Sequence, residues 1–138
     1  MDKNIKEIGW EETIEVRHRV LWPDMPPEFC HIEDDSIGWH FGYYLESKLV
    51  SVASVYPNKK EARLRKFATL EDVQGQGIGT ELLNYILSSV KKRGIVSFWC
   101  DARESSVSFY ERFGMAAEGE RFFKEGVPYF KMSMKLTK

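Results

Sequence analysis

Three glycines alternate with larger residues in the segment Gln74-Gly75-Gln76-Gly77-Ile78-Gly79. Glycine removes the side chains that would keep an anionic ligand away from the backbone. The amides that follow, through Thr80, belong to the first turn of a predicted helix, where backbone N–H groups have no acceptor within the helix. Such a helix N-terminus is suited to bind phosphate groups. The segment therefore predicts a site for a phosphorylated ligand.

Two common phosphate-binding loops match this segment poorly. A Walker P-loop ends in Gly-Lys-Ser/Thr, but here Gly79 is followed directly by Thr80. A dinucleotide-binding loop has the pattern G-x-G-x-x-G after the first strand of a parallel sheet; Gly75 and Gly77 match it, and Thr80 takes the third position. Asp101 stands where a ribose-binding acid is expected, yet the predicted antiparallel hairpins before the loop argue against that fold.

The periodicity of the chain predicts how these residues are positioned. Residues 39–45 alternate in the manner of a strand, and the helix after the loop has one apolar face, formed by Leu82, Leu83, Ile86, Leu87 and Val90. We expect strands at 5–8, 39–45, 49–56, 61–70, 95–100, 116–123 and 129–136, with helices at 13–21, from the loop to Gly94, and at 104–113. This order predicts a single α/β domain over residues 1–138, with a mixed central sheet of six to seven strands and helices on both faces.

Composition excludes several classes of protein. The 138 residues carry 20 Lys and Arg against 21 Asp and Glu, so the basic surplus of a nucleic-acid binder is missing. No apolar run is long enough to span a membrane, and residues 1–7 lack the apolar core of a signal peptide. Cys30 and Cys100 are not in metal-ligand spacing, so we expect no metal and a reducing, cytoplasmic location.

Two motifs resemble those of one family. Residues 67–83, FATLEDVQGQGIGTELL, resemble the acetyl-CoA-binding motif Q/R-x-x-G-x-G/A of the GNAT acyltransferase superfamily, with Gln74, Gly77 and Gly79 at the defining positions. Residues 108–115, SFYERFGM, resemble its second signature, a helix with an aromatic-Tyr pair that ends at a glycine. The order of predicted elements also agrees. The resemblance implies an N-acetyltransferase that uses acetyl-CoA and needs no metal.

The resemblance also implies which residues bind coenzyme A. The amides from Gly75 to Thr80, with Gln76 and Ile78 among them, should meet the pyrophosphate, and we expect the Gln74 side chain to brace the loop. In the family, the strand before the loop diverges from the next one, so Phe67, Ala68 and Thr69 would contact the pantetheine arm through main-chain groups; ordinary sheet pairing is the alternative. An asparagine that often contacts the arm is replaced here by Glu104-Ser105-Ser106, so that either Ser105 or Ser106 substitutes for it or the contact is absent.

Tyr110 is the predicted catalytic residue. Attack of an amine on a thioester expels a thiolate, and a phenol with a reference pKa of about 10 stays protonated to neutralise it. Packing within a helix face is the alternative role for this side chain. The general base stays open, because the strand before the loop has no carboxylate in its inner part. Glu61, His40 and the cluster Glu33-Asp34-Asp35 are the alternatives.

The acceptor is expected near the early elements, around Trp22, Phe29, Trp39 and Tyr44. Antibiotics, polyamines, amino acids and protein amines stay open, with a small-molecule amine favoured over a protein. Neither cysteine has the basic neighbour of a nucleophile, so we expect direct transfer in a ternary complex. The alternative function is a non-catalytic acyl-CoA-binding module. The resemblance is compatible with a homodimer, for which no residue of the chain argues.

Overall fold

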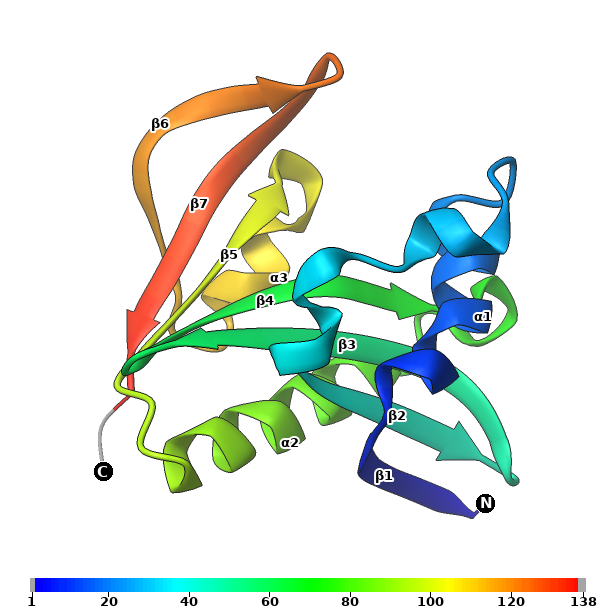
Figure 1. The fold of residues 1–138 in the computed structure, drawn as a ribbon. Coiled ribbons are helices and arrows are strands. Elements are labelled where there is room, and N and C mark those ends of the chain that lie inside the picture. The colour runs from blue at the N-terminus through cyan, green and yellow to red at the C-terminus, as the bar shows by residue number, and fades with distance from the viewer. Residues whose placement is uncertain (1, 137–138) are drawn as a thin grey trace.

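The computed structural model describes residues 2–136. Seven strands form one sheet in the order β1-β2-β3-β4-β5-β7-β6 (Figure 1). The strands are β1 (Lys3–Ile8), β2 (Trp39–Leu45), β3 (Lys48–Asn58), β4 (Glu61–Thr69), β5 (Ser97–Arg103), β6 (Ala116–Lys124) and β7 (Val127–Lys135). The α-helices are α1 (Trp10–Leu21), α2 (Ile78–Lys92) and α3 (Val107–Glu111), and the short 3-10 helices are η1 (Pro27–Cys30), η2 (Glu33–Ile37), η3 (Glu71–Val73) and η4 (Glu104–Ser106).

The sheet is mixed, with helices on both faces, as predicted. β4 and β5 run parallel, and every other pair of neighbouring strands within residues 2–136 is antiparallel. Helix α1 packs over β2, β3 and β4, while α2 packs against the opposite face of the same strands (Figure 1). Within residues 2–136, no helix combines the length and the apolar composition that a membrane span requires.

Helix α2 forms the centre of the core. Leu82, Leu83, Ile86 and Val90 are fully buried, as the helical spacing predicts, whereas Leu87 is only partly buried. Burial of a side chain of this size contributes about 1.5–3 kcal/mol. The core therefore fixes the position of α2, and with it the position of the glycine segment at the N-terminus of the helix.

Two helices differ from their predicted bounds. Helix α1 begins at Trp10 rather than at Thr13, because the Gly9 amide donates to Glu12 Oε1 at 3.2 Å. This cap uses a glycine in place of the Ser, Thr, Asp or Asn that marks most helix starts, so the sequence gives little signal for it. The later helix is shorter than the predicted 104–113, because Glu104–Ser106 winds as a 3-10 turn before α3.

The hairpin of β6 and β7 curls away from the rest of the sheet (Figure 1). Its turn lies at Glu125 and Gly126, as predicted, and both residues have positive φ (52° and 79°). The register of the hairpin shifts between Glu118 and Phe122, where Gly119 also has positive φ. Such an irregularity increases the local twist of a strand, which accounts for the curl.

Candidate active site

The glycine segment forms an open loop that leads into α2. Gly77 is the N-cap residue and, like Gly75, has positive φ (82° and 79°). A Cβ atom at either position would meet no other atom within 4 Å, so the backbone of the loop faces open space. The amides of Ile78, Gly79 and Thr80 occupy the first turn, where the helix supplies them with no acceptor. The loop therefore presents N–H groups that fit a phosphate.

A groove of about 820 Å³ starts at this loop and brings together most of the predicted cofactor-binding residues. The predicted residues that line it are Phe67, Ala68, Thr69, Gln74, Gly75, Gly77, Ile78, Gly79, Thr80, Ser106 and Tyr110. Gln76 and Ser105 are not among the lining residues. Of the two serines considered in place of the family's asparagine, Ser106 is thus the one at the groove.

The two central strands part along one wall of the groove. β4 pairs with β5 only over Glu61–Arg63 and Ser97–Trp99 within the described residues. Beyond that ladder, residues 67–69 of β4 line the groove instead of pairing with β5. Backbone polar groups need partners when water is excluded, and the amide-containing arm of coenzyme A could supply them. The residues present therefore fit this cofactor.

Gln74 braces the loop, as the sequence suggested. Its Nε2 atom donates a hydrogen bond of 2.8 Å to the carbonyl oxygen of Thr69 at the end of β4. The Thr69 hydroxyl is in turn 2.8 Å from the hydroxyl of Ser51 on β3. Because Thr69 is tied to two elements, the approach of the chain from β4 into the glycine segment is fixed.

Tyr110 lies on α3 and lines the same groove, half-buried. Burial, reinforced by the neighbouring Cys100 thiol, raises the pKa of Tyr110 well above its usual range. The phenol is therefore protonated at neutral pH and able to donate a proton. Burial also raises the pKa of Cys100 to about 12, which leaves the thiol protonated and a poor nucleophile.

Two arginines in the groove wall were missed by the sequence reasoning. Arg103 ends β5 and Arg112 follows α3, and both line the groove beside the loop. Arginine is well suited to bind phosphate oxygens. The basic runs Lys59-Lys60 and Lys91-Lys92-Arg93 do not line this groove, and Arg93 is paired with Glu7. Only the fold places residues 103 and 112 near residues 74–80.

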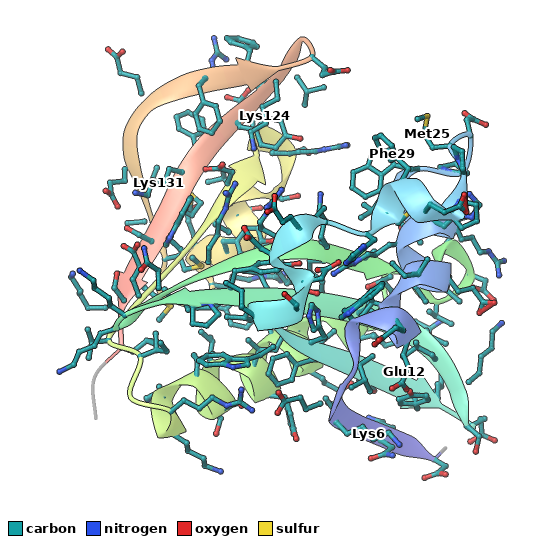
Figure 2. All side chains as sticks on the ribbon, viewed as in Figure 1. Lys6, Glu12, Met25, Phe29, Lys124 and Lys131 are labelled. Atoms are coloured by element: carbon teal, nitrogen blue, oxygen red, sulfur yellow. The ribbon has the colours of Figure 1, made fainter. Side chains whose placement is uncertain are left out.

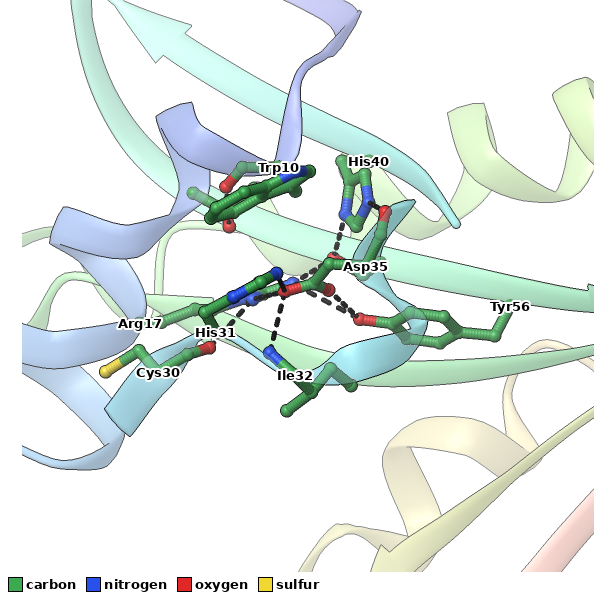
Figure 3. A network of polar contacts seen from close by, with 10 residues as sticks. Trp10, Arg17, Cys30, His31, Ile32, Asp35, His40 and Tyr56 are labelled. Atoms are coloured by element: carbon green, nitrogen blue, oxygen red, sulfur yellow. Dashed lines mark hydrogen bonds and ion pairs between the residues drawn. The ribbon is translucent and has the colours of Figure 1, made fainter. Parts of the chain in front are cut away.

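Two of the alternatives for the general base belong to a buried network under α1 (Figure 3). Arg17 and Asp35 form a bidentate ion pair, with N–O distances of 2.9 and 3.1 Å and both side chains fully buried. The Tyr56 hydroxyl donates to Asp35 at 2.6 Å. His40 is 2.7 Å from the Ser54 hydroxyl and 2.9 Å from the carbonyl oxygen of Asp35. All hydrogen-bonding atoms of these groups are engaged inside the protein, except Arg17 Nε.

Neither group is placed to accept a proton from an acceptor amine. Burial alone would raise the pKa of Asp35, but hydrogen bonds from Arg17, Tyr56 and the Ile32 amide outweigh it and lower the pKa to about 2. Burial lowers the pKa of His40. A carboxylate held this firmly is a very weak base, so Asp35 is unsuited to accept the proton of the amine. Glu61, the third alternative, begins β4 at the end remote from the glycine loop and pairs with Ser97.

The four aromatic residues expected around the acceptor do not gather in one place. Trp22 and Phe29 pack edge to face near the end of α1, with ring centroids 5.3 Å apart. Trp39 lies instead under the guanidinium of Arg93, which comes from the end of α2 on the opposite face of the sheet. Tyr44 donates a hydrogen bond to Glu12 near the start of α1. The expectation was wrong for Trp39 because strand alternation sends it to the α2 face.

Comparisons with known proteins bear on the family of the chain. Residues 23–136 match the model of the acetyltransferase (GNAT) domain. The chain is 33% identical over 132 residues to the uncharacterized N-acetyltransferase YitI of Bacillus subtilis (strain 168), with 89% of each chain covered. The fold is similar to that of the ribosomal-protein-S18-alanine N-acetyltransferase from Escherichia coli (TM-score 0.81, 18% identity, 99% and 96% of the two chains covered).

A third relative was crystallised with the expected cofactor. The fold is similar to that of the PaiA N-acetyltransferase from Thermoplasma acidophilum, solved in complex with coenzyme A (TM-score 0.74, 18% identity, 98% and 99% of the two chains covered). The family model spans most of the chain, and its match includes the whole glycine loop and α3. The chain described here therefore belongs to the GNAT acetyltransferase family.

Proposed function

We propose that this protein is an N-acetyltransferase that moves an acetyl group from acetyl-CoA directly to the amine of an acceptor, a small molecule in preference to a protein. The observation that carries the proposal is the groove, which joins a phosphate-binding helix N-terminus, an unpaired strand edge and a protonated phenol. These are the three parts needed to hold coenzyme A and to release its thiol.

The loop and its neighbours hold the donor. Amides from Gly75 to Thr80 and the guanidinium groups of Arg103 and Arg112 meet the phosphates, while β4 residues 67–69 bind the arm through main-chain groups. Each charge-assisted hydrogen bond of this kind contributes about 1.5–3 kcal/mol. The donor supplies the thioester, and the chain orients it between β4 and β5.

Tyr110 acts as the general acid. The neutral acceptor amine attacks the thioester carbon, and the Tyr110 hydroxyl gives its proton to the departing sulfur. Because none of Glu33, Asp34, Asp35, His40 and Glu61 lines the groove, we assign deprotonation of the amine to solvent. The pH dependence of the rate should then follow the pKa of the acceptor amine.

The experiment combines binding and turnover. Calorimetry with coenzyme A should show one site per chain, and acetyl-CoA with a panel of amines should release free thiol at a rate that depends on the amine. Coenzyme A binding without thiol release across a broad panel would favour the non-catalytic module. The absence of any coenzyme A binding by folded protein would overturn both readings.

A further inference from the structure

Four cations from β4 and β6 gather on the α1 side of the sheet, and the proposed chemistry uses none of them. They are Arg63, Arg65, Lys66 and Lys124. Asp101 on β5 serves two of them, because its Oδ2 accepts hydrogen bonds from Arg63 at 2.9 Å and from Lys124 at 3.1 Å. Within residues 2–136, Arg65 and Lys66 have no carboxylate within 4.0 Å. The cluster thus carries an excess of positive charge.

A β-bulge places Arg65 and Lys66 on the same face. Ser54 pairs with Arg65 and Val52 with Ala68, so β4 has one residue too many between these pairs. The backbone of Lys66 has φ +57°, a conformation that costs a non-glycine residue about 1–3 kcal/mol and is concentrated at functional sites. Bulges commonly re-aim a side chain in this way.

The contacts of the side chains show the result of the bulge. The guanidinium of Arg65 lies 5.8 Å from the Tyr56 ring, and the Lys66 ammonium lies 4.3 Å from the centroid of the Trp22 ring. Phe67, by contrast, packs edge to face against Phe109 on the groove side. The strand thus turns consecutive residues 65 and 66 to one side and residue 67 to the other.

The cation cluster adjoins the groove at Leu21 and Phe67. Lys66 precedes Phe67, and Trp22, which contacts Lys66, follows Leu21; Phe67 and Leu21 both line the groove. Lys124 comes from the β6–β7 hairpin, which stands on the same side of the sheet as Phe29 of η1 (Figure 2). If the amine of an acceptor entered between β4 and β5 from this side of the sheet, the rest of the acceptor would lie beside these side chains.

Lys66 is poorly compensated in the free protein. Burial, together with the positive charges of Arg65, Arg17 and Lys124, lowers the pKa of Lys66 to about 8, although Asp35 opposes the shift. Half-buried charges without a partner are costly, because burial removes hydration that no opposite charge replaces. A bound anion would supply that partner.

We propose that Lys66, assisted by Arg65 and Lys124, binds an anionic group of the acceptor, so that the acceptor is a small amine carrying a carboxylate or a phosphate. This inference rests on the proposed acetyl transfer and specifies its substrate class. Lys66 is then a residue of acceptor recognition and takes no proton from the amine.

Matched acceptor pairs test the proposal. Glutamate and aspartate are compared with their uncharged diamides, and phosphoethanolamine with ethanolamine, by the kcat/KM for thiol release from acetyl-CoA. We expect the charged member of at least one pair to be preferred about tenfold or more. The amine of the charged member is the more basic one and is less deprotonated at neutral pH, so such a preference runs against intrinsic reactivity. The two arms separate carboxylate from phosphate recognition.

The variant Lys66→Met tests whether Lys66 causes the preference for the charged acceptor. Methionine keeps an unbranched chain against Trp22 and the same backbone conformation while it removes the charge. The preference for the charged member should be lost, because kcat/KM falls about tenfold or more for the charged members and far less for the uncharged ones. Lys91→Met, at the exposed end of α2, is the matched control and should behave as the unsubstituted protein. An equal loss for both members of a pair would identify Lys66 as part of the chemistry and overturn the proposal.

A binding measurement keeps this test separate from that of the proposed function. Calorimetry with the same acceptors, in the presence of coenzyme A, needs no turnover. Selective binding of the charged member, lost in Lys66→Met, supports the inference even if no thiol is released. Equal binding or equal turnover of both members in the unsubstituted protein overturns the inference, while thiol release in that case still supports acetyl transfer.

Discussion

The groove that we assign to the donor and the face that we assign to the acceptor are built from different parts of the chain. The donor groove relies mostly on main-chain groups, which are the amides after Gly75 and the edge of β4 left free by β5, with Arg103 and Arg112 beside them. The acceptor face relies on side chains from β4, β5 and β6 and on Trp22, which follows α1. A ligand that stays the same across a family can be bound by backbone groups. A ligand that differs between members of the family must be recognised by side chains.

The largest expected effect concerns Tyr110, the side chain that we propose as the general acid. Tyr110→Phe should lower kcat by about 10²–10⁴, because the departing sulfur loses its proton donor. The affinity for coenzyme A should stay unchanged, since the ring still fills its place. Stopped-flow thiol release and calorimetry measure the two quantities. A variant with full turnover would remove Tyr110 from the mechanism.

The next effect concerns the buried network under α1, which belongs to neither region. Asp35→Asn should lower the free energy of unfolding by about 3–5 kcal/mol, because Arg17 stays buried without its carboxylate. Denaturant titration measures the change. Glu104→Gln breaks an exposed pair with Arg121 and is the matched control, with an expected loss below about 1 kcal/mol.

Because the pKa of Asp35 is lowered, the contribution of the Arg17–Asp35 pair to stability depends on pH. Its value of about 2 in the folded protein lies below the ordinary value of 3.8, so the ionised carboxylate stabilises the fold. This stabilisation is fully present above pH 4 and is lost as the pH falls from about 4 to 2. The acid limb of unfolding should therefore be shallower in Asp35→Asn. Identical acid limbs would show that the pair contributes nothing to this dependence.

A smaller effect is expected on the donor side. Gly79→Val places a branched side chain toward Phe67, whose ring edge lies 3.4 Å from a Cβ at this position. We expect the dissociation constant for coenzyme A to rise about 10–100-fold, as the loss of one or two charge-assisted hydrogen bonds implies, with little change in stability. Ser88→Val, exposed on the same helix, is the control. Gly77→Val is a poorer test, because its positive φ adds backbone strain.

The smallest effect is the pH dependence of acceptor choice. Below pH 8 the Lys66 ammonium is charged in the free protein, and as the pH rises through 8 it loses its proton and its hold on an anion. The preference for glutamate over its diamide should therefore decline across pH 7–9. Division by the same ratio for Lys66→Met cancels the titration of the acceptors themselves. A ratio that stays flat would exclude a role for the charge of Lys66.

The difference between features set by neighbouring residues and contacts between distant residues explains what the sequence could predict. The glycine segment, the apolar face of α2 and the hairpin turn at Glu125 depend on neighbouring residues, so local patterns predicted them. The buried pair of Arg17 and Asp35 joins residues whose types usually lie at the surface, so nothing in composition predicted it.

The groove arginines and the bulge were unpredictable for related reasons. Arg103 and Arg112 line the same groove as the glycine segment only because the fold brings the end of β5 and the residue after α3 to it. The bulge at Lys66 arises without the glycine that often marks such a site, and it reverses the alternation on which strand reading depends. The sides of the sheet to which the side chains after residue 65 point could therefore be learned only from the structure.

The short ladder between β4 and β5 has a mechanical consequence. The glycine loop and Tyr110 belong to different halves of the molecule. The loop leads into α2, which packs on the strands up to β4, whereas Tyr110 lies on α3, which packs on β6 and β7. The two halves are joined by the short ladder between β4 and β5. A cofactor arm that was hydrogen-bonded to β4 and in contact with α3 would therefore hold the two halves together. Loading the donor would then stiffen the whole sheet and set the phenol at its working distance before any acceptor arrives.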